Sequence, residues 1–246
     1  MKREILSLDR ITVIQEESTV LHDVNLRINA GEIVGLITVT GLGVDALIDV
    51  MVSNTPIHYG SVYYDGKRIH SYHRPANHPN PVAIIEKQSR LVESLTVADN
   101  IFVLRRNFRS YLVKPRMMEK QIQPHLEDIS RLGITIPVGA LVADLSPVQR
   151  LAVEILKAVM TGIHLVILRN ISTFVSVVDL ALIHELIRSY AARGMAFLYV
   201  CNHHQETFTI ATHAAIMEDG TIRKVLRPAQ MNDMGWKHMP LPSPRR

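Results

Sequence analysis

The hydrophobic pattern over the first part of the chain predicts strands followed by one helix. Residues 11–14 are β-branched, and apolar residues alternate with polar ones over 20–28. Residues 32–37 form a continuous apolar run, which is typical of a buried strand. Residues 44–51 then carry apolar side chains at helical spacing. The pattern therefore predicts a strand, a turn and a helix in succession over 32–51.

The middle of the chain combines a hairpin, a loop and a helical region. Residues 60–69 contain two short strand patterns around an Asp-Gly pair, which is a common hairpin turn. Residues 70–81 are rich in proline and histidine and are expected to form a loop before another short strand at 82–85. From 97 to 132 the pattern is helical and predicts no strand.

The second half of the chain alternates between helices and strands. Helices are predicted at 146–159 and 177–192, and apolar strands at 164–168 and 196–201. This alternation favours an α/β fold with a mainly parallel sheet. Residues 227–246 hold four of the twelve prolines and show little periodicity, so a loose tail is expected there.

Composition narrows the class of protein. The chain has 246 residues, of which 47% are hydrophobic and 20% charged, the balance of a globular protein. No apolar run reaches the ~20 residues that span a bilayer, and the first residues lack a secretory segment. Cys201 is the only cysteine, so a reducing cytoplasm is the expected compartment.

The net charge is +4, with an isoelectric point near 9.3. Lysine and arginine are scattered along the sequence and form only short clusters. A mildly basic, solvated surface explains this distribution better than a nucleic-acid interface does, and nucleic-acid binding is not expected.

The turn between the strand at 32–37 and the helix at 44–51 has the outline of a phosphate-binding loop. A working loop has the form G-x-x-x-x-G-K-[ST], in which backbone amides hold phosphates, the lysine contacts the outer ones and the hydroxyl binds Mg²⁺. The corresponding residues here are Thr38, Gly41 within the turn, Gly43, Val44 and Asp45. The second glycine is present, but the first glycine, the lysine and the hydroxyl are all replaced.

The order of these segments resembles the ATP-binding cassette (ABC) ATPase domain over about residues 6–225. The phrases that carry the resemblance are GEIVGL, GSVYYDGKRI, LTVADNIFV, VADLSPVQRLAVEILKAV and, as the closing strand, AAIMEDGTI. The phrases LTVADNIF and VEILKA are most similar to ATPases of bacterial monosaccharide importers. The resemblance implies a P-loop NTPase α/β core with an antiparallel β edge. It places the domain at 1–226, an inserted helical subdomain at about 90–148 and the tail at 227–246.

The resemblance also identifies where this chain departs from the family. There a buried strand ends in Asp-Glu, of which the Asp supports Mg²⁺ and the Glu polarises the attacking water. Here that strand ends in Arg169 and Asn170, a cation and an amide that cannot act as a base. The glutamine that senses metal and γ-phosphate corresponds to Lys87, with Gln88 beside it. The other replaced positions are the adenine-stacking aromatic (Gln15), the switch histidine (Asn202, followed by His203) and the aspartate of the segment that communicates across the dimer (Ser176).

The signature segment of the family, LSGGQ, reads LSPVQ at 145–149. In the family each ATP lies between the loop of one subunit and this segment of the other. Ser146 can still cap the following helix and contact a γ-phosphate, and Gln149 is retained. Pro147 has no N–H, and Val148 adds bulk where glycine allows close approach. The chain is therefore expected to be a poor partner for another subunit's nucleotide.

Electrostatics sharpens the expectation for the loop. Two unit charges about 4 Å apart interact by roughly 4 kcal/mol at an effective dielectric of 20. Val44 in place of lysine removes an attraction of that order, and Asp45 adds a similar repulsion. Loop amides favour an anion by only ~0.3–2 kcal/mol. No cofactor is therefore expected, and ATP with Mg²⁺ is expected to bind only weakly.

Charged and histidine side chains leave further interpretations open. Arg169 and Lys87 could form a new anion site, or one of them could pair with Asp45; the pair is preferred because an unpaired buried charge is costly. The candidates for a metal site are two sets of histidines, His203 and His204 with His213, and His70, His73 and His78. Neither set has a cysteine or carboxylate at ligand spacing, so no metal site is expected.

These features predict a degenerate ABC ATPase-like subunit that keeps docking surfaces and has lost hydrolysis. The resemblance implies an ABC permease, an active ABC ATPase, or both, as partners, with residues 88–120 as the docking region. It also implies a place at the inner face of the cell membrane. Two alternatives are a weakly active ATPase that uses displaced residues such as Gln88 and His203, and a scaffold that binds another anion in the old nucleotide site.

Overall fold

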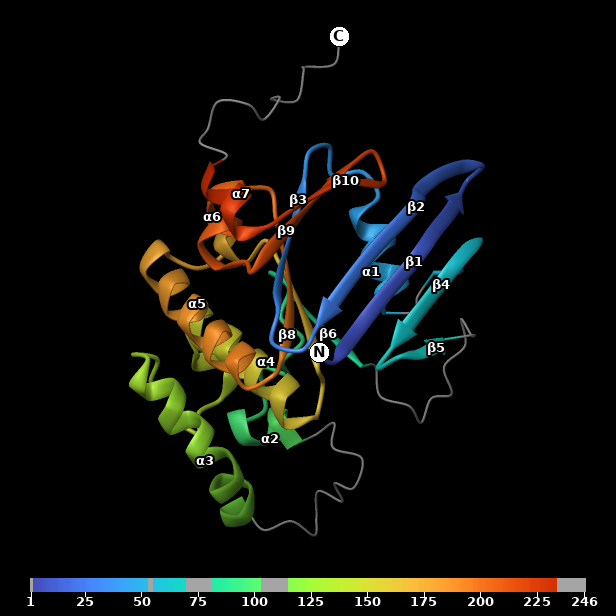
Figure 1. Ribbon diagram of the computed structural model, residues 1–246. Helices are drawn as coiled ribbons and strands as arrows, with labels where there is room; N and C mark the ends of the chain where they lie inside the picture. The colour runs from blue at the N-terminus through green and yellow to red at the C-terminus, as the bar shows by residue number, and fades with distance from the viewer. Residues whose placement is uncertain (1, 53–54, 70–80, 103–114, 234–246) are drawn as a thin grey trace.

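The computed structural model describes residues 2–52, 55–69, 81–102 and 115–233. Within these ranges the chain forms two β-sheets with helices between and beside them (Figure 1). The four-stranded sheet has the order β2-β1-β4-β5, and the six-stranded sheet has the order β10-β9-β3-β8-β7-β6.

The four-stranded sheet is antiparallel throughout. Its strands are β1 (Glu4–Gln15), β2 (Ser18–Asn29), β4 (Tyr59–Tyr64) and β5 (Lys67–Ile69). The hairpin predicted over 60–69 is confirmed. Its turn residues Asp65 and Gly66 have φ of 48° and 71°, the positive values that a tight two-residue hairpin turn requires. This sheet is the antiparallel edge expected from the sequence.

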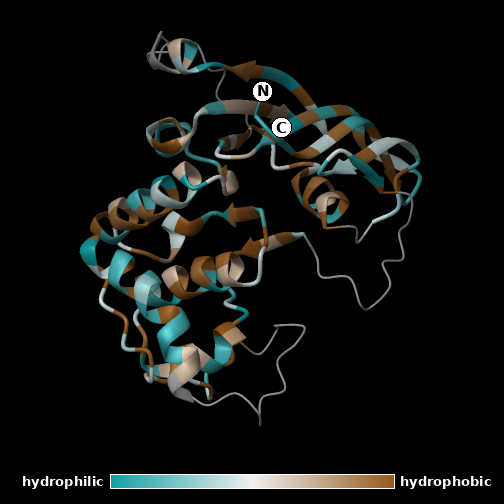
Figure 2. Cartoon of the chain, turned by 60° about the horizontal axis from the view of Figure 1, so that its bottom comes forward, coloured by the Kyte–Doolittle hydropathy of each residue, from teal (hydrophilic) through white to brown (hydrophobic). Residues whose placement is uncertain are grey.

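The six-stranded sheet contains a parallel centre. β3 (Ile33–Thr38), β6 (Val82–Ile85), β7 (Leu165–Arg169) and β8 (Ala196–Cys201) run parallel to their neighbours, as the alternation of strands and helices predicts. All six residues of β3 and all six of β8 are buried, and the central strands are largely brown in Figure 2. Their apolar runs therefore reflect burial by helices on both faces.

The segment AAIMEDGTI forms two strands, so its interpretation as one closing strand is wrong. β9 (His213–Glu218) pairs parallel to β3, and β10 (Thr221–Leu226) turns back antiparallel to β9. Asp219 and Gly220 form the turn, with φ of 45° and 72°. An Asp-Gly pair between apolar runs is a hairpin signal, and it ends the strand here.

Two apolar cores lie on the two faces of the six-stranded sheet. Helix α1 (Val44–Met51) lies between the sheets and packs in the core that they share (Figure 1). The other core is covered by α4 (Pro147–Met160) and α5 (Val177–Ala192). α1 and α5 have the predicted bounds, and α4 begins one residue later than predicted. Short 3₁₀ helices occupy Val142–Asp144 and Ile171–Thr173, and α6 occupies His204–Ile210.

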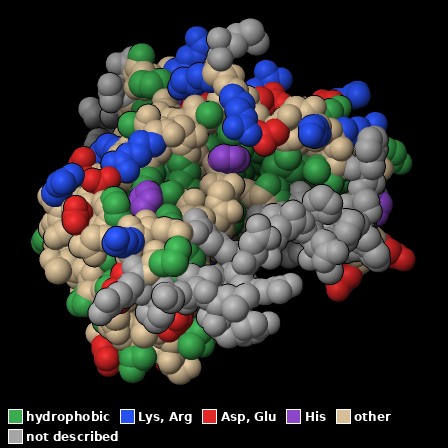
Figure 3. Space-filling model, turned by 90° about the horizontal axis from the view of Figure 1, so that it is seen from below, with side chains coloured by type: hydrophobic (Ala, Val, Ile, Leu, Met, Phe, Trp, Pro, Cys, Tyr) green, Lys and Arg blue, Asp and Glu red, His purple; other side chains and the backbone are tan. Residues whose placement is uncertain are grey.

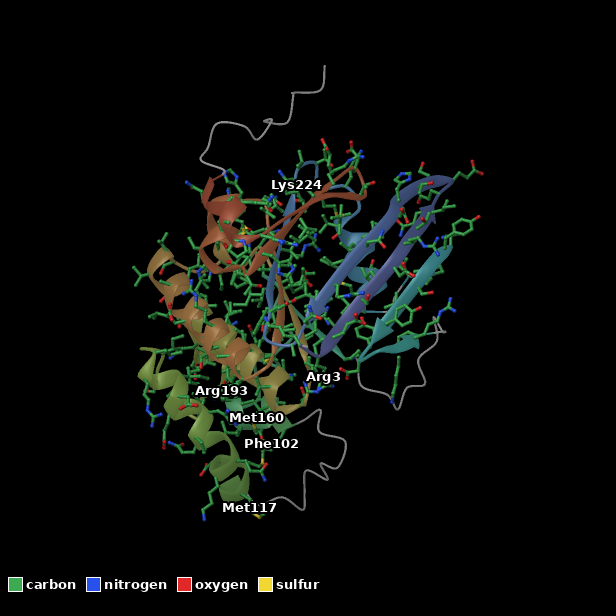
Figure 4. All side chains as sticks on the ribbon, in the orientation of Figure 1. Arg3, Phe102, Met117, Met160, Arg193 and Lys224 are labelled. Carbon is green, nitrogen blue, oxygen red and sulfur yellow. The ribbon has the colours of Figure 1, made fainter. Side chains whose placement is uncertain are left out.

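The predicted helical region contains α2 (Val97–Phe102) and α3 (Pro115–Arg131). Phe102, labelled in Figure 4, is 2% exposed and belongs to the same apolar core as α4 and α5. Arg193, at the end of α5 in the same view, pairs with Asp128 of α3 at 2.7 Å. The helical region is therefore anchored to the core of the chain. Its expected bounds, about 90–148, stay a prediction.

Helix α7 (Pro228–Asp233) corrects the expectation of a loose tail from residue 227. Met231 is 7% exposed and packs against Ile37, Ala214 and Leu226. The packed part of the chain thus extends beyond the predicted boundary at 226, because one apolar side chain of the tail is buried. Residues 234–246 lie outside the described ranges.

Candidate functional site

The carboxyl ends of β3, β6, β7 and β8 lie at one edge of the sheet, because these strands run parallel. Ligands of open α/β sheets bind outside this kind of edge. Thr38 and Arg169 are the last residues of β3 and β7, Glu86 and Asn202 follow β6 and β8, and Asp45 lies in the first turn of α1. We call this edge the strand-end site and define it by Thr38, Asp45, Glu86, Arg169 and Asn202.

The glycine loop keeps its shape for reasons of packing. Gly43 has φ of 80° and precedes the first residue of α1. A Cβ atom there would lie 2.7 Å from the carbonyl oxygen of Val20 and 2.9 Å from the Cα of Gly220. Gly41 also has positive φ, 74°, but a Cβ there would meet no atom within 4 Å. Gly43 is therefore required by the contact with β2 and the β9–β10 turn, without any phosphate.

Val44, in place of the phosphate-binding lysine, belongs to the core. Its side chain is 5% exposed and packs in the apolar cluster around α1. Asp45, the next residue, is exposed and directs its carboxylate to the strand-end site. Arg169 Nη2 lies 2.5 Å from Asp45 Oδ1, and Arg169 Nη1 lies 4.0 Å from Glu86 Oε2. The preferred interpretation of the sequence, an ion pair with Asp45, is confirmed with Arg169 as the cation.

Thr38 and Asn202 form the second polar contact of the strand-end site. The Thr38 hydroxyl donates a 2.8 Å hydrogen bond to the Asn202 side-chain oxygen. Thr38 is 8% exposed, so its hydroxyl needs this partner. The hydroxyl of Thr38, from the loop, and the side-chain oxygen of Asn202, after β8, thus serve as each other's hydrogen-bond partners.

Asn170, which the sequence analysis predicts to replace the catalytic glutamate, has a structural role. Its backbone is left-handed, with φ of 48°, a conformation that asparagine tolerates better than most residues. Its N–H donates to the Val200 carbonyl at 2.9 Å, and Thr173 Oγ1 donates to the Asn170 carbonyl at 2.7 Å. The residue turns the chain from β7 into the following 3₁₀ helix.

His203 and Cys201 lie where β8 leads into α6. His203 is exposed and precedes the first residue of α6, and its N–H donates to Cys201 Sγ at 3.3 Å. Cys201 is 1% exposed, and burial raises the pKa of its thiol to about 11. The described residues contain no group of three or more metal-ligating side chains, and His70, His73 and His78 lie outside them.

The signature segment forms the capped start of α4. Ser146 Oγ accepts from the Gln149 N–H at 3.4 Å, and Gln149 Oε1 accepts from the Ser146 N–H at 2.8 Å, which is a capping box. Gln149 Nε2 also donates to the Thr135 carbonyl at 2.6 Å. Ser176 caps α5 in a similar way, accepting from the Asp179 N–H at 3.1 Å. Their polar groups therefore stabilise helix ends.

Lys87 and Gln88 are exposed and line a groove beside the strand-end site. The groove has a volume of about 610 Å³ and lies between the segment 86–91 and the start of α4. We call it the α4 groove. Its apolar lining consists of Ile85, Leu91, Leu145, Pro147, Leu151 and Phe174. Its charged lining consists of Glu86, Lys87, Glu93, Arg150 and Glu154.

Two charged residues of this groove were missed by the sequence reasoning. Arg150 binds Glu93 at 2.9 Å and donates to the carbonyls of Leu145 and Ala143. Glu154 is 8% exposed, and burial raises its pKa. The signal available in the sequence was a glutamate among the apolar residues of the helix predicted at 146–159.

Residues 21–170 match the model of the ABC transporter family. The chain belongs to the ABC transporter family. This confirms the resemblance inferred from the sequence. The matched range covers the glycine loop, α1, most of the α4 groove and the strand that ends in Arg169, whereas Phe174 and Asn202 lie beyond it.

Proteins similar in sequence include ATP-binding proteins for sugar import. The ribose import ATP-binding protein RbsA of Streptococcus agalactiae serotype Ia is 24% identical over 209 residues, covering 82% of this chain and 41% of the relative. RbsA 3 of Rhizobium meliloti is 28% identical, covering 81% of this chain and 38% of the relative. The arabinose import ATP-binding protein AraG 1 of Burkholderia ambifaria is 25% identical, with coverage of 93% and 44%. The chain thus spans less than half the length of these relatives.

Two solved structures of ABC cassettes share the fold. MJ1267, an ATP-binding cassette of an ABC transporter in its ADP conformation, has a TM-score of 0.75 at 20% identity and covers 94% of both chains. The cbiO1 protein of Clostridium perfringens, part of the ABC transporter complex cbiONQ, has a TM-score of 0.80 at 16% identity, with coverage of 95% and 92%. The predicted P-loop NTPase fold is confirmed.

The surface and the helices add two observations on this ABC family member. On the face seen in Figure 3, Lys and Arg side chains lie among Asp and Glu side chains. Among the described helices, none is both long and apolar enough to cross a membrane.

Proposed function

We propose that this chain is an ATP-binding-type subunit of a sugar-import ABC transporter that has lost ATP hydrolysis. Its relatives are named for ribose and arabinose import, which supports the sugar class. The ion pair of Arg169 with Asp45 at the strand-end site is the observation that supports the proposed loss of hydrolysis. The guanidinium and the carboxylate occupy the edge where a nucleotide's phosphates and metal ion would need to lie.

The chemistry left at this site does not support metal-assisted phosphoryl transfer. Such transfer needs a cation to neutralise the outer phosphates and a carboxylate or amide that orients water. Val44 is buried in the core, and Asp45 would repel a phosphate. Asn170 is held in a turn by its own backbone. Each function is absent for a separate structural reason, so a single substitution does not restore the site.

The same ion pair weighs against the two alternatives. A scaffold that binds another anion would need the Arg169 guanidinium to be free of carboxylates. Asp45 lies 2.5 Å and Glu86 4.0 Å from it. A weakly active ATPase would need Gln88 or His203 to replace the lost groups. Gln88 lines the α4 groove and His203 precedes α6, so neither belongs to the residues that define the strand-end site.

The proposed role is structural or regulatory and depends on a permease. The α4 groove takes four of its lining residues, Gln88, Ser89, Leu91 and Glu93, from the region 88–120, and it combines an apolar lining with charged side chains. We assign it as the place where a segment of the membrane permease docks, at the inner face of the membrane. An active ABC ATPase is the expected second partner.

Equilibrium titration with ATP, with and without Mg²⁺, tests the proposal. The expected result is no Mg²⁺-dependent binding, together with co-purification of a permease or of a second ABC ATPase from the native host. Micromolar, Mg²⁺-dependent affinity would instead support the weak ATPase. Metal-independent binding of inorganic phosphate or pyrophosphate that is lost in Arg169→Gln would support the anion scaffold.

A further inference from the structure

Glu154 is a buried carboxylate that opens into the α4 groove. It lies on α4 and is 8% exposed. Its Oε1 atom accepts from Ser89 Oγ at 2.5 Å and from the Arg90 N–H at 2.9 Å. Both of these bonds go to the same oxygen. The carboxylate thus fixes Ser89 and Arg90 against α4, and no hydrogen bond among the described residues uses its Oε2 atom.

Among the described residues, no cation forms an ion pair within 4.0 Å of Glu154, although Lys157 and Arg90 lie close enough to lower its pKa. Three carboxylates and two cations line the groove. One of the cations, Arg150, already binds Glu93 and two backbone carbonyls. Lys157 and Arg90 act on Glu154 through space, and neither forms one of the described ion pairs with it. Burying a charge without a close counter-ion is costly, and a cation brought into the groove would offset that cost.

We infer that Glu154 determines which segment docks in the α4 groove, by binding a Lys or Arg side chain in the centre of that segment. This inference rests on the proposed function, because it assigns the chemistry of the docked partner. The apolar lining receives the hydrophobic side of an amphipathic helix. Glu154 receives a cationic head whose methylene stem lies along Leu91 and Leu151.

The size and charge of the groove fit this occupant. A volume of about 610 Å³ lies within the 300–1,000 Å³ typical of sites that bury a compact ligand, and it suits the side chains of about one helical turn. The excess of carboxylates selects against an acidic segment, since a buried like charge opposite Glu154 would repel it.

The test uses two synthetic helical peptides and the full chain. Each peptide has about 14 residues and is lactam-stapled, because a free helix of that length is marginal in water. One carries lysine in the centre of its apolar face and the other carries norleucine, which has a similar length and no charge. Binding is measured by fluorescence polarisation to the natural chain, to Glu154→Gln and to the control Glu127→Gln, which replaces an exposed glutamate of α3.

The lysine peptide is expected to bind the natural chain and Glu127→Gln at least about tenfold more tightly than the norleucine peptide, the size of a charge-assisted hydrogen bond. Glu154→Gln is expected to lose this preference while staying folded with a melting temperature no lower than that of the natural chain, because Gln still accepts from Ser89 and Arg90. Equal binding of both peptides to the natural chain overturns the role of Glu154 and leaves docking in the groove intact. Failure of both peptides to bind overturns the inference and the proposed docking site together.

Discussion

The strand-end site and the α4 groove lie side by side but differ in how their polar groups are satisfied. At the strand-end site, Arg169 pairs with Asp45 and Thr38 bonds Asn202, so its polar side chains are satisfied within the chain. In the groove, Glu154 is buried, hydrogen-bonded through one oxygen and faces an open space. We therefore propose that the side chains of the first region occupy the place of a ligand, whereas the second region can receive one.

Under the proposed function, this difference would let one fold lose catalysis and keep a role. Arg169 pairs with Asp45 and Thr38 with Asn202 outside the lining of the groove, whereas Lys87 and Pro147 line it. The glycine loop, α1 and the strands remain because they are parts of the core, as Gly43 and Val44 demonstrate.

The largest expected effect concerns Gly43. Gly43→Ala is expected to lower the free energy of unfolding by about 3 kcal/mol, since the new Cβ clashes with Val20 and the positive φ is strained. Gly41→Ala, with a similar φ but open space around it, is the control and is expected to cost about 1 kcal/mol. Urea unfolding measures both. Equal costs would mean that packing does not explain why Gly43 is retained.

The next effect concerns repair of the loop. Val44→Lys with Asp45→Ser is expected to raise Mg-ATP affinity by about tenfold, because it restores an attraction and removes a repulsion. Turnover is expected to remain absent, because Arg169 and Asn170 are unchanged. Calorimetric titration and a phosphate-release assay check the two parts, with Asp45→Ser alone as the control. Turnover in the double variant would show that the catalytic strand is misassigned.

A smaller effect is expected for the ion pair itself. Asp45→Asn should lower the free energy of unfolding by about 0.5 kcal/mol, since exposed pairs contribute little and the Asp45 side chain is 70% exposed. The difference should shrink as salt is added. Asp49→Asn, in the same helix and outside the described ion pairs, is the control. An Asp45→Asn variant that is insensitive to salt and no less stable would contradict an intact pair in solution.

The smallest effect is a pH dependence at Glu154. Burial raises its pKa above the ordinary 4.5, so the folded chain binds this proton more tightly than the unfolded chain does. The natural chain should therefore lose stability relative to Glu154→Gln as pH rises from 4.5 through the raised pKa. Melting temperatures of the two proteins across this range measure the difference. If the melting temperature of the natural chain rises relative to that of Glu154→Gln as pH rises, Glu154 is not a buried and incompletely paired carboxylate.

The sequence predicts the strand-end site better than it predicts the groove. The glycine loop, α1 and Arg169 follow from local patterns, because strand and helix periods and the position after a strand are visible in sequence. Which cation pairs with Asp45 depends on how neighbouring strands align, so Arg169 and Lys87 could not be separated. Glu154 takes part in the groove through its hydrogen bond with Ser89, which lies 65 residues away in the chain. No local sequence pattern predicts such a contact.

Phosphate release from saturating Mg-ATP by the full chain tests the central claim most directly. The account predicts a rate equal to that of buffer without protein, because the strand-end site holds an ion pair where phosphates and metal would lie. Release that requires Mg²⁺ and is abolished by Asn170→Ala would contradict it.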